Sequence, residues 1–251
     1  MNDLALLIDL HRKATRQGPG GDAETRLAIS LSGLADAKHL RIADIGCGTG
    51  ASTLVLANEL DAIITAVDFL PDFLTELEQR AEDEAVAKRI TTLAASMEDM
   101  PFEEATLDAI WSEGAIYNIG FANGIRTWRR FLQPGGILAV SELTWLTAER
   151  PAKLDDHWNR EYPEVATASA KLTLLEAHGY SPIGYFPLPE KCWLDNYYRP
   201  MQQRFEAFLE RHDTSEAAQA VVEAEQVEIS LYERFSAFVS YGYYVARKLP
   251  D

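Results

Sequence analysis

Cysteine is scarce in this 251-residue sequence, which contains only two. Cys47 and Cys192 are far apart, and neither lies in a CxxC pair or at the Cys/His spacing of a zinc ligand set. A secreted disulfide scaffold needs more cysteines, and a structural zinc site needs Cys and His ligands at short, regular spacing. The sequence therefore predicts no disulfide framework and no metal site.

Long apolar runs are also absent from the sequence. The first residues, MNDLALLIDLHRK, contain a short apolar stretch with Asp3 and Asp9 in and around it, and they lack the cationic start of a signal peptide. No segment approaches the roughly 18 apolar residues that a membrane-spanning helix requires. We expect a cytoplasmic protein without a membrane partner.

Positive charge is in deficit, with 23 Lys and Arg against 39 Asp and Glu and a formal net charge of −16. A field of that sign repels phosphate backbones, and the basic residues are scattered apart from Arg126, Arg129 and Arg130. We therefore expect no nucleic acid as substrate or partner. The same acidity is equally compatible with solubility alone.

Hydrophobic residues make up 47% of the chain, enough for a substantial core. From residue 40 onward, short apolar runs alternate with segments of helical periodicity, the pattern of a doubly wound α/β fold with a mostly parallel sheet. The seven expected strands are residues 40–46, 62–69, 90–96, 106–114, 135–143, 181–193 and 240–249. Residues 151–180 and 195–238 read as helical cap segments, the second inserted before the last strand.

A glycine-rich loop, ADIGCGTGA at residues 43–51, joins the first expected strand to the first helix. Gly46, Gly48 and Gly50 allow the backbone to turn sharply and approach a ligand closely. In an open α/β sheet, ligands bind beyond the carboxyl ends of the strands. The loop is therefore placed to bind a nucleotide-like cofactor.

Two cofactors fit this loop. Gly46-x-Gly48-x-x-Ala51 resembles a dinucleotide fingerprint, whereas Asp44-x-Gly46-x-Gly48-x-Gly50 suits S-adenosylmethionine (SAM). Asp68, at the end of the second strand, could accept hydrogen bonds from ribose hydroxyls in either case. Asp44 discriminates, because a carboxylate repels a pyrophosphate and attracts the ammonium group of SAM.

The core resembles the class I SAM-dependent methyltransferases, which have a Rossmann-like fold. The matching stretches are Asp44–Gly50, Asp68 with Phe69, SMEDMPF at 96–102, LDAIWSEGAIYNI at 107–119 and FLQPGGILAVSE at 131–142. The sequence is most similar to the small-molecule branch and to uncharacterised bacterial methyltransferases with the same SEGAIYNIG stretch. This resemblance implies SAM as methyl donor, S-adenosylhomocysteine (SAH) as product and a small-molecule acceptor.

The resemblance also assigns cofactor contacts. The family commonly places an acidic adenine contact after the third strand, but this sequence has Ser96 there, followed by Met97 and Glu98. Glu98 could replace that contact, and an adenine slot between Phe69 and Met97 competes with simple core packing. We expect cofactor binding by Asp44, Gly46, Cys47, Gly48, Gly50, Asp68, Phe69, Ser96, Met97, Glu98 and Ser112, with Cys47 and Ser112 contributing mainly backbone.

For the reaction, placement of the acceptor supplies most of the acceleration, and a base helps when a proton must leave. Glu113 and Tyr117 follow the fourth strand and are our candidate catalytic residues, since both would face the acceptor. Glu142, at the end of the fifth strand, is a second candidate base. Glu142, Trp145, Trp193 and Tyr197 are expected to line the acceptor site, although large aromatics more often serve packing.

Residues 1–39 are interpreted as an N-terminal helical lid, because the Gly18–Gly21 stretch suits a hinge, and residues 40–251 as the methyltransferase domain. Two rival functions stay open: a catalytically silent SAM-binding regulatory protein and an NAD-dependent oxidoreductase. The aromatic-rich segment 195–238 could form a cap, a homodimer contact or both.

Overall fold

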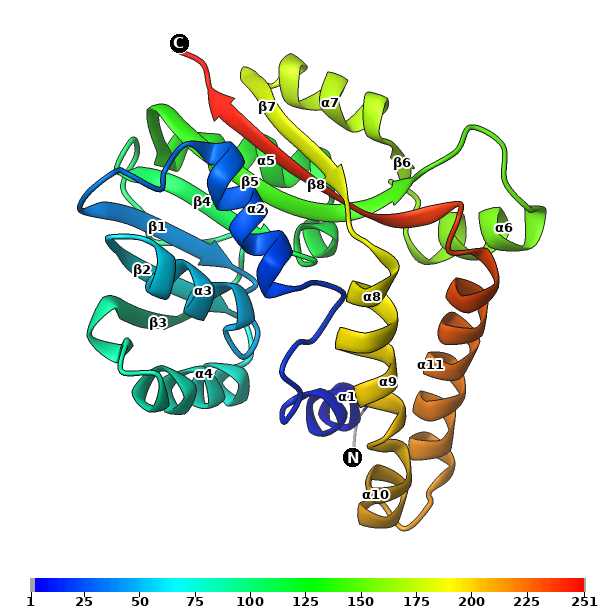
Figure 1. Cartoon of the computed structure of the whole chain (residues 1–251). Helices are drawn as coiled ribbons and strands as arrows, with labels where there is room; N and C mark the ends of the chain where they lie inside the picture. Colours follow the sequence, from blue (N-terminus) through cyan, green and yellow to red (C-terminus); the bar gives the residue numbers. More distant parts are fainter. Residues whose placement is uncertain (1–2, 251) are drawn as a thin grey trace.

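The computed structural model describes residues 3–250 and is built on one open sheet (Figure 1). Its long strands follow the order β3-β2-β1-β4-β5-β8-β7, and the two-residue β6 pairs with β5. Strands β1 to β5 are parallel along this order, whereas β8 is antiparallel to both β5 and β7. The strands are β1 Leu40–Ile45, β2 Ala62–Asp68, β3 Ile90–Ala94, β4 Leu107–Glu113, β5 Leu132–Trp145, β6 Ala166–Thr167, β7 Tyr180–Pro187 and β8 Val239–Lys248. The expected fold class is confirmed.

The parallel strands are apolar on both faces because helices cover both sides of the sheet. Ile42 of β1 packs into the cluster that contains Leu54 of α3, while Ile45 packs on the other face with Trp128 of α5. All of these side chains are at most 3% exposed. The helices are α1 Asp3–His11, α2 Asp22–Ser32, α3 Ala51–Glu59, α4 Pro71–Asp83, α5 Phe121–Trp128, α6 Ala152–Glu161, α7 Ala168–Ala177, α8 Glu190–Trp193, α9 Arg199–Gln202, α10 Phe205–Arg211 and α11 Glu216–Phe235.

Three expected elements differ from the structure. The strand expected at 181–193 ends at Pro187, and Glu190–Trp193 is helical, because prolines 187 and 189 lack the N–H that a sheet ladder needs. The helix expected across 151–179 is interrupted at Tyr162–Pro163 and resumes at α7. The fifth strand begins at Leu132 rather than at residue 135, with an irregular register opposite Leu107–Ala109.

The chain between β7 and β8 forms the helices α8 to α11, which stand to one side of the sheet next to α1 (Figure 1). Leu6 and Leu10 of α1 are buried within the same apolar cluster as Phe208 of α10 and Val222 of α11. By contrast, α2 packs against β7 and β8 of the sheet. Within the expected lid of residues 1–39, α1 therefore packs among the cap helices, whereas α2 lies on the sheet and contacts the cap through Glu24, whose Oε1 lies 3.1 Å from Nζ of Lys191 on α8.

Across residues 3–250, no helix is both long enough and apolar enough to cross a membrane. The homodimer considered above stays a prediction.

Candidate functional site

The glycine loop leaves β1 with three residues in the left-handed region, Gly46 at φ +72°, Gly48 at +56° and Gly50 at +86°. A Cβ on Gly46 would collide with the side chain of Ala115, and one on Gly48 would collide with Gln17. Only glycine satisfies both the conformation and the space at these positions. The loop therefore approaches two other segments closely, the turn after β4 and the N-terminal segment.

Asp68 ends β2 beside this loop. Its Oδ2 accepts a hydrogen bond from the N–H of Gly48 at 2.9 Å, and its Oδ1 accepts one from the N–H of Leu70 at 2.9 Å. Burial raises the pKa of Asp68 even though these hydrogen bonds oppose the shift. A carboxylate has about four lone-pair sites, so Asp68 is held in place by two donors and can still accept two more.

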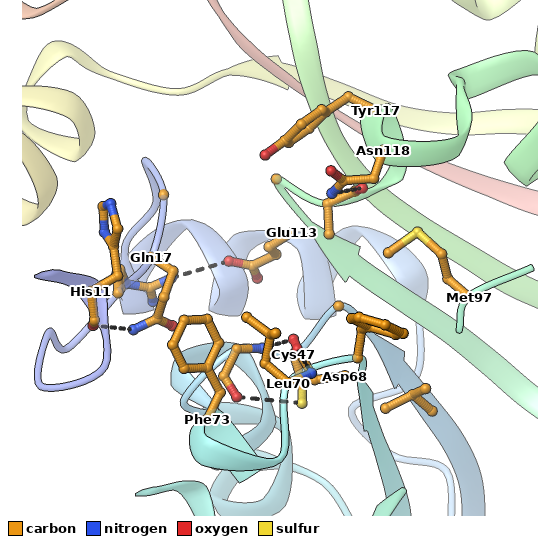
Figure 2. Close-up of a pocket in the computed structure, with 18 of the residues that line it drawn as sticks. His11, Gln17, Cys47, Asp68, Leu70, Phe73, Met97, Glu113, Tyr117 and Asn118 are labelled. Carbon is orange, nitrogen blue, oxygen red and sulfur yellow. Dashed lines mark hydrogen bonds and ion pairs between the residues drawn. The ribbon is translucent and has the colours of Figure 1, made fainter. Parts of the chain in front are cut away.

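A cavity of about 650 Å³ lies beyond the carboxyl ends of the strands and is here called the large cavity. Figure 2 shows Asp68, Cys47 and Phe73 on one side of it, Met97 on another, and His11 and Gln17 of the N-terminal segment opposite Met97. Phe69 is 69% exposed, an unusual state for phenylalanine outside a binding surface. The large cavity is lined by eight of the eleven expected cofactor residues: Gly46, Cys47, Gly48, Asp68, Phe69, Ser96, Met97 and Glu98.

The other three expected cofactor residues, Asp44, Gly50 and Ser112, are absent from this lining. Asp44 is fully buried, and its Oδ2 accepts hydrogen bonds from the hydroxyls of Ser52 and Thr53 in the first turn of α3. Burial raises the pKa of Asp44 to about 7. Its carboxyl group thus fixes the start of α3 beneath the loop, while its Oδ1 has no hydrogen-bond partner among the described residues. The expected contact of Asp44 with the cofactor stays a prediction.

Gly50 and Ser112 lie outside the cavity for packing reasons. Gly50 precedes α3 and approaches Leu77 of α4 so closely that a Cβ would collide with that side chain. The hydroxyl of Ser112 is buried in β4 and has no hydrogen-bond partner among the described residues. Ser112 therefore does not offer its side chain to the large cavity.

A second cavity of about 460 Å³ adjoins the first and is here called the aromatic cavity. Tyr117 lines both cavities. The aromatic cavity, but not the large cavity, is also lined by Trp158, Tyr162, Trp193 and Tyr241. Both cavities are lined by Gln17, Gly18, Pro19, Gly114, Tyr117, Tyr197, Glu225 and Glu228. These shared residues form a junction at which two ligands could meet.

Tyr117 lies at this junction, in the 3₁₀ turn Ile116–Ile119, and is 44% exposed. Figure 2 shows its hydroxyl directed into the cavity, above Glu113. Burial raises the pKa of Tyr117, and the nearby charge of Glu228 on α11 adds to the shift. Tyr117 therefore lies where a ligand in either cavity would meet it, and its expected contact with an acceptor stays a prediction.

Glu113 ends β4, and its carboxylate accepts four hydrogen bonds. Oε1 accepts from Thr25 at 2.6 Å, Tyr243 at 3.0 Å and Trp111 at 3.1 Å, and Oε2 accepts from Arg16 at 3.2 Å. These donors match the roughly four lone-pair sites of a carboxylate. Although burial favours the neutral form, the charges of Glu113 and Asp22 raise the pKa of Arg16.

Glu113 therefore joins β4 to the N-terminal segment through a buried ion pair. This arrangement leaves little room for the general-base role we expected, because an incoming proton donor would have to displace an existing partner.

Two of the four residues expected at the acceptor site line the aromatic cavity, Trp193 and Tyr197, and two do not. Trp145 is 3% exposed, with the guanidinium of Arg150 stacked 4.2 Å from its ring centre. Glu142 is 1% exposed, and its Oε1 lies 3.9 Å from Nζ of Lys171. Burial raises the pKa of Glu142 despite the opposing charge of Lys171. Trp145 and Glu142 are buried residues on opposite faces of β5 and line neither cavity. The structure therefore does not bring them to the expected acceptor site.

Sequence reasoning missed several residues that line the cavities. His11 and Gln17 come from the N-terminal segment, and Glu225 and Glu228 lie three residues apart on α11. The spacing of the two glutamates places them on one helix face, but their position beside the sheet follows from how the cap folds. Among residues 3–250, no group of three or more His, Cys, Asp or Glu side chains is arranged to hold a metal ion.

Comparisons with known proteins agree with this geometry. A family described as "Methyltransferase domain" matches residues 42–136. The 27-O-demethylrifamycin SV methyltransferase of Amycolatopsis mediterranei is 28% identical over 240 residues, which is 92% of this chain and 85% of that protein.

Solved structures with this fold include a SAM-dependent methyltransferase from Geobacter sulfurreducens, crystallised with SAH. It has a TM-score of 0.80 and 19% identity, with 97% of this chain and 96% of that chain covered. The [4+2]-cyclase SpnF has a TM-score of 0.77 and 19% identity, with 99% and 93% covered. Residues 42–136 thus match a methyltransferase domain, the chain is similar over most of its length to a known methyltransferase, and it shares the fold of solved SAM-dependent methyltransferases.

Proposed function

We propose that the protein transfers a methyl group from SAM to a small-molecule acceptor. The observation that carries this proposal is the pair of adjoining cavities, one beside the glycine loop and one lined by aromatic rings, that share Tyr117 and Tyr197. Methyl transfer needs two ligands in contact and in line, so acceleration comes mainly from holding them together.

The residues of the large cavity fit SAM. Gly46 and Gly48 let the loop lie against Ala115 and Gln17 in the cavity wall, where a Cβ would collide with those side chains, and Asp68 retains lone pairs for the two ribose hydroxyls. Phe69 and Met97 offer an apolar slot for the adenine ring, with Ser96 and Glu98 beside it. When bound, SAM supplies a methyl group already activated on a sulfonium.

The residues at the junction would position the acceptor and exclude water. Residues 17–19 cover the boundary between the two cavities from the N-terminal side. Tyr117 is the candidate catalytic residue that we retain, since its hydroxyl faces the junction. For Glu113 we propose an anchoring role, because its four hydrogen bonds tie β4 to the segment that carries Arg16.

A thermal-shift comparison of SAM, SAH and NAD tests cofactor choice. A ligand that binds only the folded protein raises the melting temperature in proportion to RT ln(1 + [L]/Kd). We expect SAM and SAH to stabilise the protein and NAD to leave it unchanged. Stabilisation by NAD alone would support the oxidoreductase alternative instead.

Turnover separates a methyltransferase from a SAM-binding protein without that activity. The similarity to a structure described as a [4+2]-cyclase motivates this second candidate, because the same fold can serve another reaction. Conversion of SAM to SAH should depend on an added acceptor from a panel of small hydroxyl, amine and thiol compounds. Tight binding of SAM with no acceptor-dependent SAH would favour the second candidate.

A further inference from the structure

The walls of the aromatic cavity are rigid aromatic surfaces. Trp193 stacks on Tyr232 with ring centres 4.4 Å apart, and the edge of Tyr241 packs against it at 4.9 Å. Nε1 of Trp193 donates to the hydroxyl of Ser240 at 3.0 Å, which fixes the indole. Tyr117 meets Tyr162 edge to face at 6.2 Å. Ring faces of this kind attract cations through their quadrupoles.

Carboxylates occupy the same cavity. Glu225 and Glu228 of α11 line it together with Glu161 of α6. Oε1 of Glu228 accepts a hydrogen bond from the hydroxyl of Tyr198 at 2.7 Å, which orients the carboxyl group. Burial raises the pKa of Glu228 to about 7, and the charges of Glu225 and Glu161 add to the shift.

No cationic side chain in residues 3–250 lies within 4 Å of the Glu228 oxygens. Glu225 has one basic neighbour, His11, with Nε2 at 3.6 Å. The remaining basic groups nearby are otherwise engaged or neutralised. Arg160 pairs with Glu161 at the exposed rim, and burial lowers the pKa of His157. Arg16, on the N-terminal segment, is bonded to Glu113 and Asp22.

We propose that the acceptor carries a cationic nitrogen, an ammonium group that Glu228 and Glu225 bind against the rings of Tyr117 and Tyr197. This inference rests on the proposed function and names the substrate class of that same site. A half-buried carboxylate without a counter-charge is costly to ionise, and a bound ammonium would supply both the charge and the hydrogen-bond donors. An uncharged acceptor would leave that cost in place.

The negative charges of Glu225 and Glu228 also act on Tyr197. Burial raises the pKa of Tyr197, and the charges of Glu225 and Glu228 raise it further. The two carboxylates thus lie close enough to act on rings at the junction. A cation at this point would meet both the carboxylates and the aromatic faces.

Paired ligands that differ in charge but hardly in shape test the proposal. Choline is compared with 3,3-dimethylbutan-1-ol, and phenethylamine with 2-phenylethanol, by calorimetry on the full chain with and without SAH. We expect each cation to bind at least about tenfold more tightly than its uncharged partner, the preference that a cation–π contact with a carboxylate supplies. Equal binding within both pairs would overturn the inference.

Variants locate the source of the preference. Glu228→Gln keeps an oxygen for the Tyr198 hydroxyl but removes the charge, so the cation preference should fall to about threefold or less. Glu233→Gln removes the same charge from an exposed position on α11 and should keep the full preference. Glu225→Gln should reduce the preference in the same direction as Glu228→Gln, and it serves if the latter does not fold. A preference unchanged in both cavity variants would also overturn the inference.

Different results would contradict the proposed methyl transfer and the proposed ammonium acceptor. Loss of SAH binding in the unmodified protein would contradict the proposed function, whereas the cation preference is still measured without SAH. Normal SAH binding with no cation preference would leave methyl transfer standing and remove the ammonium acceptor.

Discussion

At the residue scale, Asp68 connects the glycine loop to the expected ribose contact. Asp68→Ala removes two possible ribose hydrogen bonds and also frees the N–H of Gly48. Because hydrogen bonds to a charged group contribute about 1.5–3 kcal/mol each, we expect SAH affinity to fall by at least about tenfold, measured by calorimetry. Asp72→Ala removes an exposed carboxylate from nearby α4 and is the control. Equal SAH affinity in both variants would rule out the ribose assignment.

Glu113 allows a sharper test of anchor against base. Glu113→Gln leaves Arg16 buried with Asp22 as its only carboxylate partner. Removal of one partner from a buried ion pair costs about 3–5 kcal/mol. Because Asp22 still pairs with Arg16, we expect the unfolding free energy to fall by about 3 kcal/mol, measured by urea denaturation. Glu59→Gln, which loses only an exposed pair with Arg26, should cost under about 1 kcal/mol.

The outcome of that comparison assigns the role of Glu113. An anchor loses stability together with turnover. If Glu113→Gln kept its stability and its SAH affinity but lost turnover, the carboxylate would be the general base that its position at the strand end first indicated.

The sequence located the cofactor side of the site better than the acceptor side. Gly46, Gly48 and Asp68 line the large cavity as predicted, because the position of a residue at a strand end follows from local backbone geometry. Their contacts with SAM stay predictions. Trp145 was expected at the acceptor site, but its ring is buried in the core at the end of β5. The identity of a single residue does not show whether its side chain faces the core or a cavity. Glu228 was missed because its neighbours come from elements more than 30 residues away in sequence, such as Tyr197.

At the element scale, the N-terminal segment before α2 is held over the large cavity by specific contacts. Nε2 of Gln17 donates to the hydroxyl of Thr49 at 3.0 Å, and Oε1 of Gln17 accepts from the N–H of Thr49 at 2.9 Å. Arg80 of α4 donates to the carbonyl oxygen of Thr49 at 2.7 Å. The segment therefore closes on the glycine loop itself, where a bound cofactor would touch it.

Limited proteolysis tests whether this segment acts as a lid. Trypsin can cut after Arg12, Lys13 and Arg16, and ligand contact should order the segment and lower its opening frequency. We expect saturating SAH to slow cleavage at these sites at least about fivefold, followed by mass spectrometry. Lys38, exposed before β1, is the internal control and should be cut at an unchanged rate. Equal protection at both places would indicate global stabilisation rather than a lid.

Element boundaries show where sequence patterns suffice. Pro71 begins α4, and Gly179, at φ +78°, follows α7, as expected, because both effects depend only on backbone geometry. The cap was expected as one long helical insert, yet it contains four helices with a π-helical turn at Leu194–Tyr198. Periodicity alone does not reveal such breaks, since packing against α1 and β8 determines them.

At the scale of the whole molecule, the net negative charge and the burial of carboxyl groups both make the folded state less stable as pH rises. The chain has a net charge of −16, and four carboxyl groups, those of Asp44, Asp68, Glu142 and Glu228, have raised pKa values. Each of these groups keeps its proton in the folded state at a pH at which the unfolded chain has already released it. Raising the pH therefore favours unfolding, and the self-repulsion of the negative charge adds to that trend.

The resulting prediction is a folded state that is more stable at pH 5 than at pH 7.5. For Asp44, the pKa is about 7 in the fold against 3.8 for an ordinary aspartate, so stability is lost as pH rises between these values, by up to about 1.4 kcal/mol per pH unit. Urea denaturation at constant ionic strength measures the slope. Asp44→Asn cannot ionise at this position, so its unfolding free energy should fall less steeply with pH. Its stability relative to the unmodified protein should therefore increase as pH rises. Parallel slopes for the two proteins would show that Asp44 is already ionised in the fold at pH 5, and its burial would then be compensated by Ser52 and Thr53.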